Sequence, residues 1–244
     1  MNLKTILYEN EDGKYILLDN DAISITVMSG KKWEPHFSHI VDVFISPGDT
    51  VVDCGANFGY NSVILGKKIT NSGLLISFEP QELIYKQLIA NLFINNIFNS
   101  IPYNLCLGDS TQIVQLNPIN YLSHNINIGN LSIGSGGEEC NIVKLDDIAL
   151  NENIKFMKID IQGYEYFMLK GASEIIKRYK PDIFIEIEDH QLSKFGLKKQ
   201  EIIDLLKSYG YCIFNIKNEY PCDYICTVNS MDKIKKLNLN LESV

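Results

Sequence analysis

Residues Thr50–Tyr60 read TVVDCGANFGY, and this stretch predicts a buried strand that turns through a glycine-rich loop into a helix. Its β-branched start is typical of a strand buried on both faces of a parallel sheet. Gly55 and Gly59 bracket a tight turn where a ligand can approach the backbone without meeting a Cβ, and Asn57 between them tolerates left-handed geometry. The helix that follows would point its first N–H groups at that ligand. The stretch therefore predicts a nucleotide-type pocket at the edge of an α/β sheet.

The loop lacks the dinucleotide fingerprint G-x-G-x-x-G, because the chain has Asn57 where the second glycine is needed. A pyrophosphate favours backbone donors with no anion nearby, whereas Asp53 stands at the end of the strand. A carboxylate there suits a ligand with cationic and donor groups, and S-adenosylmethionine offers an ammonium, a sulfonium and ribose hydroxyls. The simpler alternative is a strand–helix turn with a capping aspartate. We therefore expect S-adenosylmethionine rather than NAD.

Length and composition limit the class of protein. The 244 residues suffice for one α/β domain with a small extension, and 45% hydrophobic residues are typical of a globular core. We expect no membrane span, because no run of about 18 apolar residues occurs. Acidic residues near the N-terminus argue against a signal peptide, and six dispersed cysteines fit free thiols in the cytoplasm. A net charge of -8, with Arg178 as the only arginine, disfavours a nucleic-acid partner.

The first 48 residues differ in pattern from the rest. The segments 5–9 and 14–19 predict a hairpin, and the alternating segment AISITVM (22–28) predicts a further strand. Residues 36–45 predict a helix that stops before Pro47. We therefore expect a β appendage with a lead-in helix over residues 1–48 and an S-adenosylmethionine-binding domain over 49–244.

From Thr50 onward, strands and helices alternate, which predicts a mostly parallel sheet covered on both faces. Two segments at the end of the chain, YCIFNI and DYICTV, predict a final strand pair. Residues 110–140 are less regular, with possible strands at 112–116 and 140–145. The expected strands are 50–54, 74–78, 101–107, 155–159 and 182–188, and the expected helices are 58–69, 81–95, 163–179 and 198–210.

Acidic residues follow most of these strands, at the edge where ligands bind in open α/β sheets. Glu79, which precedes Pro80 at the end of the second strand, can accept hydrogen bonds from both hydroxyls of a ribose. Gly108 and Asp109 follow the third strand, where they would flank an adenine. The series comprises Asp53, Glu79, Asp109, Asp160, Glu186 and Glu188.

Eight motifs occur in an order that resembles the FkbM-type S-adenosylmethionine-dependent methyltransferases: DCGANFGYNS, FEP, NLFINN, NLCLGD, VKLDD, KIDIQGYE, LKGA and KPDIFIEIE. The resemblance covers about residues 33–190. It implies a Rossmann-like class I methyltransferase sheet with an antiparallel last strand, and O-methylation, often of a sugar or polyketide hydroxyl. It also implies cofactor-binding residues, which are Asp53, Gly55, Asn57, Gly59, Glu79, Pro80, Gly108 and Asp109.

One position departs from the family pattern. The family usually has D-V-E-G-Y-E after the fourth strand, and this chain has Gln162 in place of the first glutamate. Glutamine keeps hydrogen bonding but is neither a base nor a strong metal ligand. We expect position 162 to be structural, because Asp160 is the residue at the strand tip.

A sugar hydroxyl is a poor nucleophile, so a base or a metal ion must help to remove its proton. Asp160 is our first candidate, as base or as ligand, and Glu186 and His190 follow. Such an acidic cluster could hold Mg²⁺. His36 and His39 lie beside Glu34 but lack a third ligand nearby in sequence, so we do not expect a metal there.

The sequence does not identify the methyl acceptor. A hydroxyl of a sugar or glycan is the first expectation, with contacts from residues 120–137, residues 188–197 and the N-terminal appendage. Trp33 is either a lid over the core or a wall of the cleft. Alternatives are methylation of nucleic acid or another small molecule, and a non-catalytic S-adenosylmethionine-binding module. The segment NPINY (117–121) resembles an amino-methylation motif, but it precedes the fourth strand instead of following it.

Overall fold

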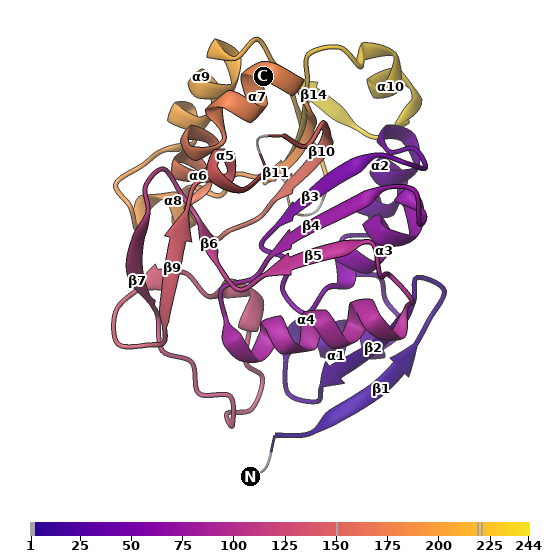
Figure 1. The fold of residues 1–244 in the computed structure, drawn as a ribbon, viewed down its shortest axis with the longest axis vertical. Coiled ribbons are helices and arrows are strands. Elements are labelled where there is room, and N and C mark those ends of the chain that lie inside the picture. Colours follow the sequence, from indigo (N-terminus) through magenta and orange to yellow (C-terminus); the bar gives the residue numbers. More distant parts are fainter. Residues whose placement is uncertain (1–2, 150, 219, 221) are drawn as a thin grey trace.

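A mixed sheet with helices on both faces forms the centre of the computed structural model, which describes residues 3–149, 151–218, 220 and 222–244 (Figure 1). In this part of the chain the sheet has eight strands in the order β14-β12-β13-β11-β10-β3-β4-β5. The strands from β11 to β5 are parallel, whereas β13 runs antiparallel between β11 and β12, as expected for the last strand. Their bounds are β3 Thr50–Cys54, β4 Leu74–Phe78, β5 Ser100–Tyr103, β10 Ile154–Ile159, β11 Asp182–Glu186, β12 Cys212–Ile216, β13 Asp223–Thr227 and β14 Leu241–Ser243.

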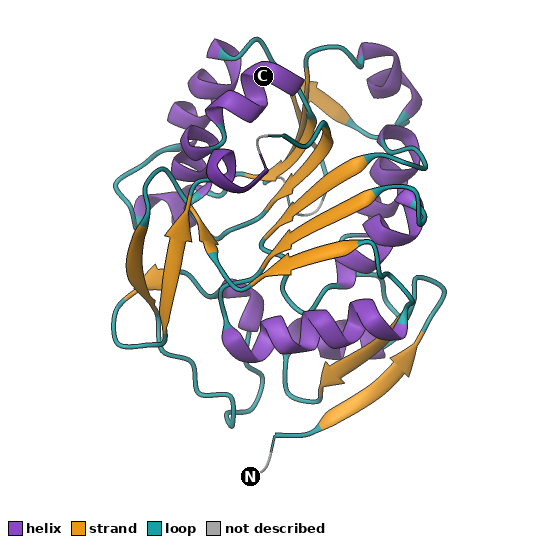
Figure 2. Cartoon of the chain, in the orientation of Figure 1, coloured by secondary structure: helices purple, strands orange, loops and turns teal. Residues whose placement is uncertain are grey.

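Each face of the sheet has its own hydrophobic cluster, because successive side chains of a strand point to opposite faces. Val51 belongs to one cluster and Val52 to the other, and both are fully buried. Helices cover both faces (Figure 2). The first cluster includes residues of α2 Pro35–Phe44, α3 Tyr60–Ile69, α4 Glu82–Ile94 and α10 Met231–Lys236, and the second includes residues of α5 Leu145–Ala149, α6 Glu165–Gly171, α7 Ser173–Tyr179, α8 Asp189–Ser193 and α9 Lys199–Ser208.

The N-terminal segment begins with the expected hairpin, β1 Thr5–Glu9 and β2 Lys14–Leu18. The strand expected at 22–28 is wrong, because these residues form the helix α1 Ala22–Met28. Asp21 caps this helix by accepting a hydrogen bond from the backbone N–H of Ser24 at 2.8 Å. Ile23 and Val27, four residues apart, are both buried. The alternation of apolar residues therefore reflects one helical face and not a strand.

The expected strand 101–107 is also wrong as a single element, because β5 ends at Tyr103 and β6 Cys106–Leu107 joins a second sheet. Between them, the Asn104 side chain donates to the backbone carbonyls of Glu79 and Pro80 at 2.9 and 2.8 Å. These bonds hold the chain where it leaves the central sheet. The second sheet has the order β6-β9-β7-β8, with β7 Gln112–Leu116, β8 Ile133–Gly134 and β9 Glu139–Val143.

The single helix expected over 163–179 is interrupted at Ala172. Gly171 lies so close to the neighbouring backbone that a Cβ there would be 1.8 Å from the carbonyl oxygen of Gly108. The Asp146 carboxylate accepts the backbone N–H groups of Glu174 and Ile175, both at 3.0 Å, and so caps the second helix from outside. The sequence pattern could not reveal a cap supplied from 28 residues away.

The division at residues 48 and 49 stays a prediction. Buried side chains between Tyr15 and Ile45 share one hydrophobic cluster with those of α3 and α4. No helix in the described part of the chain combines the length and the hydrophobicity that a membrane span requires.

Candidate active site

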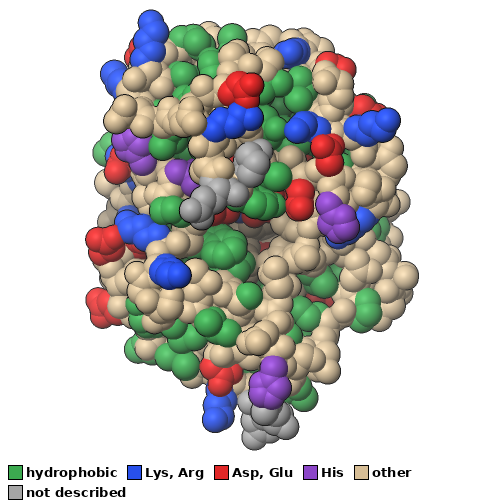
Figure 3. Space-filling model, turned by 180° about the vertical axis from the view of Figure 1, so that it is seen from behind, with side chains coloured by type: hydrophobic (Ala, Val, Ile, Leu, Met, Phe, Trp, Pro, Cys, Tyr) green, Lys and Arg blue, Asp and Glu red, His purple; other side chains and the backbone are tan. Residues whose placement is uncertain are grey.

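A cavity of about 810 Å³ lies at the carboxyl ends of β3, β4, β10 and β11. This is the edge where ligands bind in open α/β sheets. The short helix η1 Ile128–Asn130 lines the cavity, together with residues of the N-terminal segment. Viewed from behind, the molecule is hollowed near its centre, with acidic side chains at the hollow (Figure 3).

The loop after β3 forms one wall of the cavity, and its backbone shape depends on glycine. Gly55 has φ +80°, and a Cβ there would lie 1.8 Å from the carbonyl oxygen of Asp160. Asn57 also has positive φ, at 50°. Gly55 and Asn57 line the cavity, whereas Gly59 does not and instead begins α3 with φ +92° beside Leu88. The close approach of two backbone segments therefore requires a glycine at position 55, and the left-handed start of α3 requires one at position 59.

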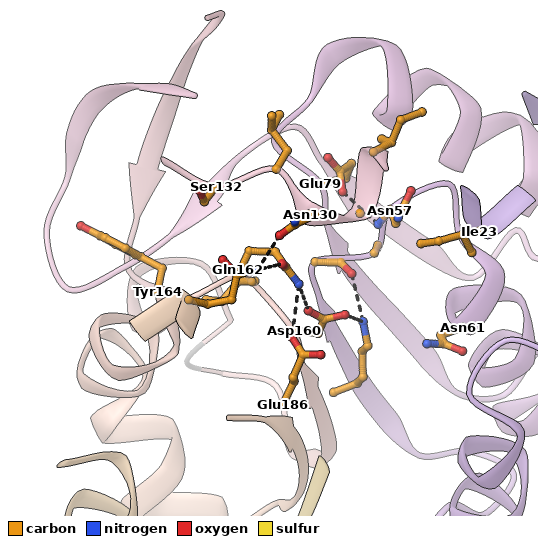
Figure 4. A pocket seen from close by; sticks show the side chains of 18 of the residues that line it. Ile23, Asn57, Asn61, Glu79, Asn130, Ser132, Asp160, Gln162, Tyr164 and Glu186 are labelled. Carbon is orange, nitrogen blue, oxygen red and sulfur yellow. Dashed lines mark hydrogen bonds and ion pairs between the residues drawn. The ribbon is translucent and has the colours of Figure 1, made fainter. Parts of the chain in front are cut away.

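Glu79 is 3% exposed and lines the cavity next to this loop (Figure 4). One of its carboxylate oxygens accepts the backbone N–H of Asn57 and the other that of Gln81, both at 2.9 Å. Burial raises the pKa of Glu79 to about 7, against the opposing effect of these two hydrogen bonds. Each oxygen keeps a further lone pair, so the carboxylate can still accept two hydroxyl groups. Pro80 lines the cavity beside it.

Asp53 does not line the cavity, although the sequence places it at the loop. It is fully buried, and Ser62 donates a hydrogen bond to its carboxylate at 2.5 Å. Nζ of Lys158 lies 3.8 Å from its other oxygen. Burial raises the pKa of Asp53, and Lys158 opposes that shift. The structure thus places Asp53 behind the cavity wall, in contact with Lys158.

Gly108 and Asp109 also lie away from the cavity. A Cβ at Gly108 would be 2.8 Å from Ile142 and 2.9 Å from Tyr164, so the close packing at this position requires glycine. Asp109 pairs with Lys170 at 3.3 Å. The neighbouring residues Leu105, Cys106 and Leu107 line the cavity instead.

Asp160 and Glu186 meet at the ends of β10 and β11, and Gln162 bridges them (Figure 4). The Gln162 amide donates to Asp160 at 2.7 Å and to Glu186 at 3.2 Å, and its oxygen accepts from Gln191 at 2.8 Å. A glutamate at position 162 would add a third carboxylate instead of a donor. The departure from the family pattern therefore suits a structural role as a cross-link.

Lys158 is the central cation of the cavity, although its position inside β10 gives no local sign of a functional role. Its ammonium donates to the carbonyl oxygen of Gly55 at 3.1 Å and to Asp160 at 3.4 Å. Burial disfavours its charge, but the nearby carboxylates of Asp160 and Asp53 outweigh that effect and raise its pKa. In contrast, burial and the negative charge of Asp160 raise the pKa of Glu186 to about 10. This shift favours the protonated form of Glu186, which can donate a hydrogen bond.

The structure adds a histidine–aspartate contact that sequence reasoning missed. Nε2 of His36, at the start of α2, lies 2.9 Å from the carboxylate of Asp223, and both residues line the cavity. His190 lines it too, but its side chain is exposed at the rim. The antiparallel direction of β13 was the available signal, because it places the first residue of that strand at the edge where the parallel strands end.

Trp33 both lines the cavity and contacts the hydrophobic core, so both roles considered for it hold. The structure gives no support for the possible magnesium site at the acidic cluster. No three His, Cys, Asp or Glu side chains among the described residues are placed to share a metal ion.

The parallel strands β5 to β11, followed by the antiparallel strand β13 and then by β12, together with a ligand cavity at the carboxyl edge, define a class I methyltransferase fold. β14 adds a second antiparallel strand beside β12. The sequence profile of the methyltransferase FkbM domain matches residues 53–213. This chain therefore belongs to the FkbM methyltransferase family, as the motifs predicted.

Solved structures show the same fold. A methyltransferase FkbM from Methylobacillus flagellatus KT superposes with a TM-score of 0.53 at 20% identity, over 75% of this chain. The chain spans 44% of the length of that protein. A SAM-dependent O-methyltransferase from Thermotoga maritima gives a TM-score of 0.51 at 12% identity, over 91% of this chain and 77% of that one. No curated protein matches the sequence.

Proposed function

We propose that this chain transfers a methyl group from S-adenosylmethionine to a hydroxyl oxygen of a sugar or glycan. The main support for S-adenosylmethionine as the methyl donor is the Glu79 carboxylate. It faces the cavity beside the loop that contains Gly55 and Asn57. Two acceptor oxygens at this place match the two hydroxyls of an adenosine ribose. A pyrophosphate would meet a carboxylate there instead of free backbone donors, which disfavours NAD.

The remaining wall supports a sugar acceptor. The rings of Trp33 and Tyr220 line it together with the hydrogen-bonding side chains of Glu34, Asn218 and Glu188. A sugar offers apolar C–H faces that suit aromatic rings and hydroxyls that suit carboxylates and amides. Lys158 is the only lysine or arginine in this lining among the described residues, and it is already surrounded by acids. This charge pattern disfavours a phosphate-rich acceptor such as nucleic acid.

Bound S-adenosylmethionine supplies an electrophilic methyl group on a positively charged sulfur. Asp160, at the tip of β10 and next to Lys158, belongs at the point where donor and acceptor meet. Its carboxylate can orient the acceptor hydroxyl and favour the positive sulfonium. The protonated Glu186 can donate to another acceptor oxygen, and His190 can contact the acceptor at the rim. The chain thereby holds the acceptor oxygen behind the methyl carbon at a separation of about 3 Å.

Donor affinity should depend on pH. Because the pKa of Glu79 is raised to about 7, its carboxyl group is mainly ionised at pH 8 and mainly protonated at pH 6. Protonation removes one of its acceptor sites, so we expect the Kd for S-adenosylmethionine to rise about tenfold from pH 8 to pH 6. Glu79→Gln should flatten this dependence. Burial also raises the pKa of Glu34 to about 7, and Glu34→Gln, measured by calorimetry at both pH values, should leave the slope in place.

The function is tested by binding and by transfer. Calorimetry should show binding of S-adenosylmethionine and not of NAD, and binding of NAD alone would overturn the donor assignment. Labelled donor should then pass its methyl group to members of a panel of methyl glycosides and oligosaccharides, with an RNA oligonucleotide as the competing acceptor class. Transfer to RNA alone would favour a nucleic-acid methyltransferase. Donor binding without transfer to any acceptor would favour a non-catalytic binding module.

A further inference from the structure

We propose that His36, held by Asp223, is the base that takes the proton from the acceptor hydroxyl. This assignment rests on the proposed function. It names the group that removes the proton, a role for which the carboxylate candidates are less suited.

The two residues come together from distant elements at the edge of the sheet. Asp223 is the first residue of β13, and in the antiparallel register it lies opposite Glu186. His36 lies in the first turn of α2, with its ring centroid 5.8 Å from that of Phe184. The side chains of His36 and Asp223 are 11% and 4% exposed, and both line the cavity that holds Asp160. The pair is therefore buried from bulk water and open to the acceptor.

The contacts of the ring leave one nitrogen for a substrate. Nε2 of His36 lies 2.9 Å from Oδ2 of Asp223, without the alignment of a full hydrogen bond. Such catalytic bonds often tighten only in the substrate complex. Nδ1 lies 3.4 Å from the side-chain amide of Asn218, an exposed residue that also lines the cavity. An acceptor hydroxyl can displace this long contact, because Nδ1 then gains a stronger partner.

Asp223 orients the ring as well as holding it. A carboxylate accepts hydrogen bonds, so it favours the imidazole form that carries its proton on Nε2. In this form, Nδ1 has a free lone pair that can accept a proton. Asp223 is thus a positioning residue, and His36 is the group that touches the acceptor.

The neighbouring carboxylates are less suited to the task. Asp160 is already engaged, because it accepts a hydrogen bond from Gln162 at 2.7 Å and lies 3.4 Å from the Lys158 ammonium. Burial and the neighbouring Asp160 favour the protonated form of Glu186, which is unsuited to take a further proton. Imidazole is also the side-chain type used most often for general acid–base chemistry.

The transfer balances in atoms and charge. The acceptor oxygen forms a bond to the methyl carbon while its proton passes to Nδ1 of His36. The carbon–sulfur bond breaks, and its electron pair stays on sulfur. The products are a methyl ether, a neutral thioether and an imidazolium, so the positive charge passes from sulfur to His36. The Asp223 carboxylate stabilises that new charge.

The first test needs no acceptor. Nitrogen NMR of histidine-labelled protein saturated with S-adenosylhomocysteine reports which ring nitrogen carries the proton, and the chain has only four histidines. The signals of His36 are those that His36→Gln removes. We expect a neutral ring at pH 8 with its proton on Nε2, and the opposite form in Asp223→Asn, where the new amide can donate to Nε2. A ring of the wild type that carries its proton on Nδ1, or on both nitrogens, would overturn the proposal.

The second test measures transfer to the methyl glycoside that the wild type methylates fastest. We expect His36→Gln to lower kcat about 100-fold, with a Kd for S-adenosylmethionine within twofold of the wild type. His39→Gln is the matched control, because His39 lies on the same helix, bonds to the carbonyl of Leu237 at 2.6 Å and does not line the cavity. That control should retain wild-type kcat.

The outcomes separate the two proposals. A wild type that binds donor but methylates no glycan overturns the proposed function, and the base assignment with it. A wild type that methylates a glycan, together with a His36→Gln variant that does so equally fast, overturns the base assignment alone. Circular dichroism of each variant shows whether a loss of activity reflects unfolding, and in that case His36→Asn replaces the glutamine variant.

Discussion

Lys158→Met should lower the free energy of unfolding by about 3–5 kcal/mol, the cost expected when one partner of a buried ion pair is removed. Lys158 is 3% exposed and lies within 3.8 Å of Asp53 and 3.4 Å of Asp160. Methionine keeps most of the side-chain volume, so the variant removes the charge with little change in packing. Asp53, which is fully buried, would lose the cation that opposes its desolvation.

Urea denaturation of Lys158→Met and of a matched surface variant would check this expectation. Lys170 pairs with Asp109 at 3.3 Å, but its side chain is 46% exposed, so Lys170→Met should cost less than about 1 kcal/mol. The double variant Asp53→Asn with Lys158→Met should recover part of the lost stability, because the remaining buried charge is removed as well. Equal effects of the two lysine variants would show that water reaches Lys158 freely.

Glu79→Gln should weaken S-adenosylmethionine binding about 30-fold, the effect of losing one or two hydrogen bonds to a charged acceptor. The amide oxygen of glutamine can still accept the N–H of Asn57 or of Gln81, but its NH₂ group cannot replace the second carboxylate oxygen. The side chain therefore keeps one of its two bonds to the loop backbone, while the ribose loses a partner. Calorimetry at pH 8, where Glu79 is mainly ionised, gives the clearest comparison.

Glu82→Gln is the control for this variant. Glu82 begins the helix that follows Glu79, and its side chain is 64% exposed and paired with Lys86. Its charge lies outside the cavity, so donor affinity should match that of the wild type. Wild-type affinity of Glu79→Gln at pH 8 would refute the assignment of Glu79 to the ribose.

Local patterns were reliable where one periodicity held over a whole element. The buried segments after Thr50 became parallel strands, and the Ser46–Asp49 turn ended α2. Errors arose where a side chain elsewhere in the chain decided the outcome. Asp21 caps α1 and also accepts the backbone N–H of Ile128. Asn104 holds the chain where β5 ends.

The residues of the candidate site also fall into two groups: those whose position follows from the sequence and the sheet topology, and those whose position depends on tertiary contacts. Glu79 and Asp160 follow their strands directly, so the parallel topology alone brings them to one edge. Asp53 lies inside β3, one residue before its end, and its side chain contacts Ser62 and Lys158 behind the wall. Which face a strand-end side chain takes depends on the last residues of the strand and on its partners, and no motif specifies these.

From its residues alone, this chain has the strand–helix alternation, the loop glycines and the acidic strand ends of an FkbM methyltransferase, because these depend on local backbone preference and burial. The folded arrangement decided the rest. Lys158 lies between Asp53 and Asp160, Gln162 joins two carboxyl groups, and His36 meets Asp223 from 187 positions away in sequence. These contacts form only when the sheet edge closes, because long-range electrostatic and hydrogen-bond partners are fixed by three-dimensional proximity and leave no periodic trace in the sequence.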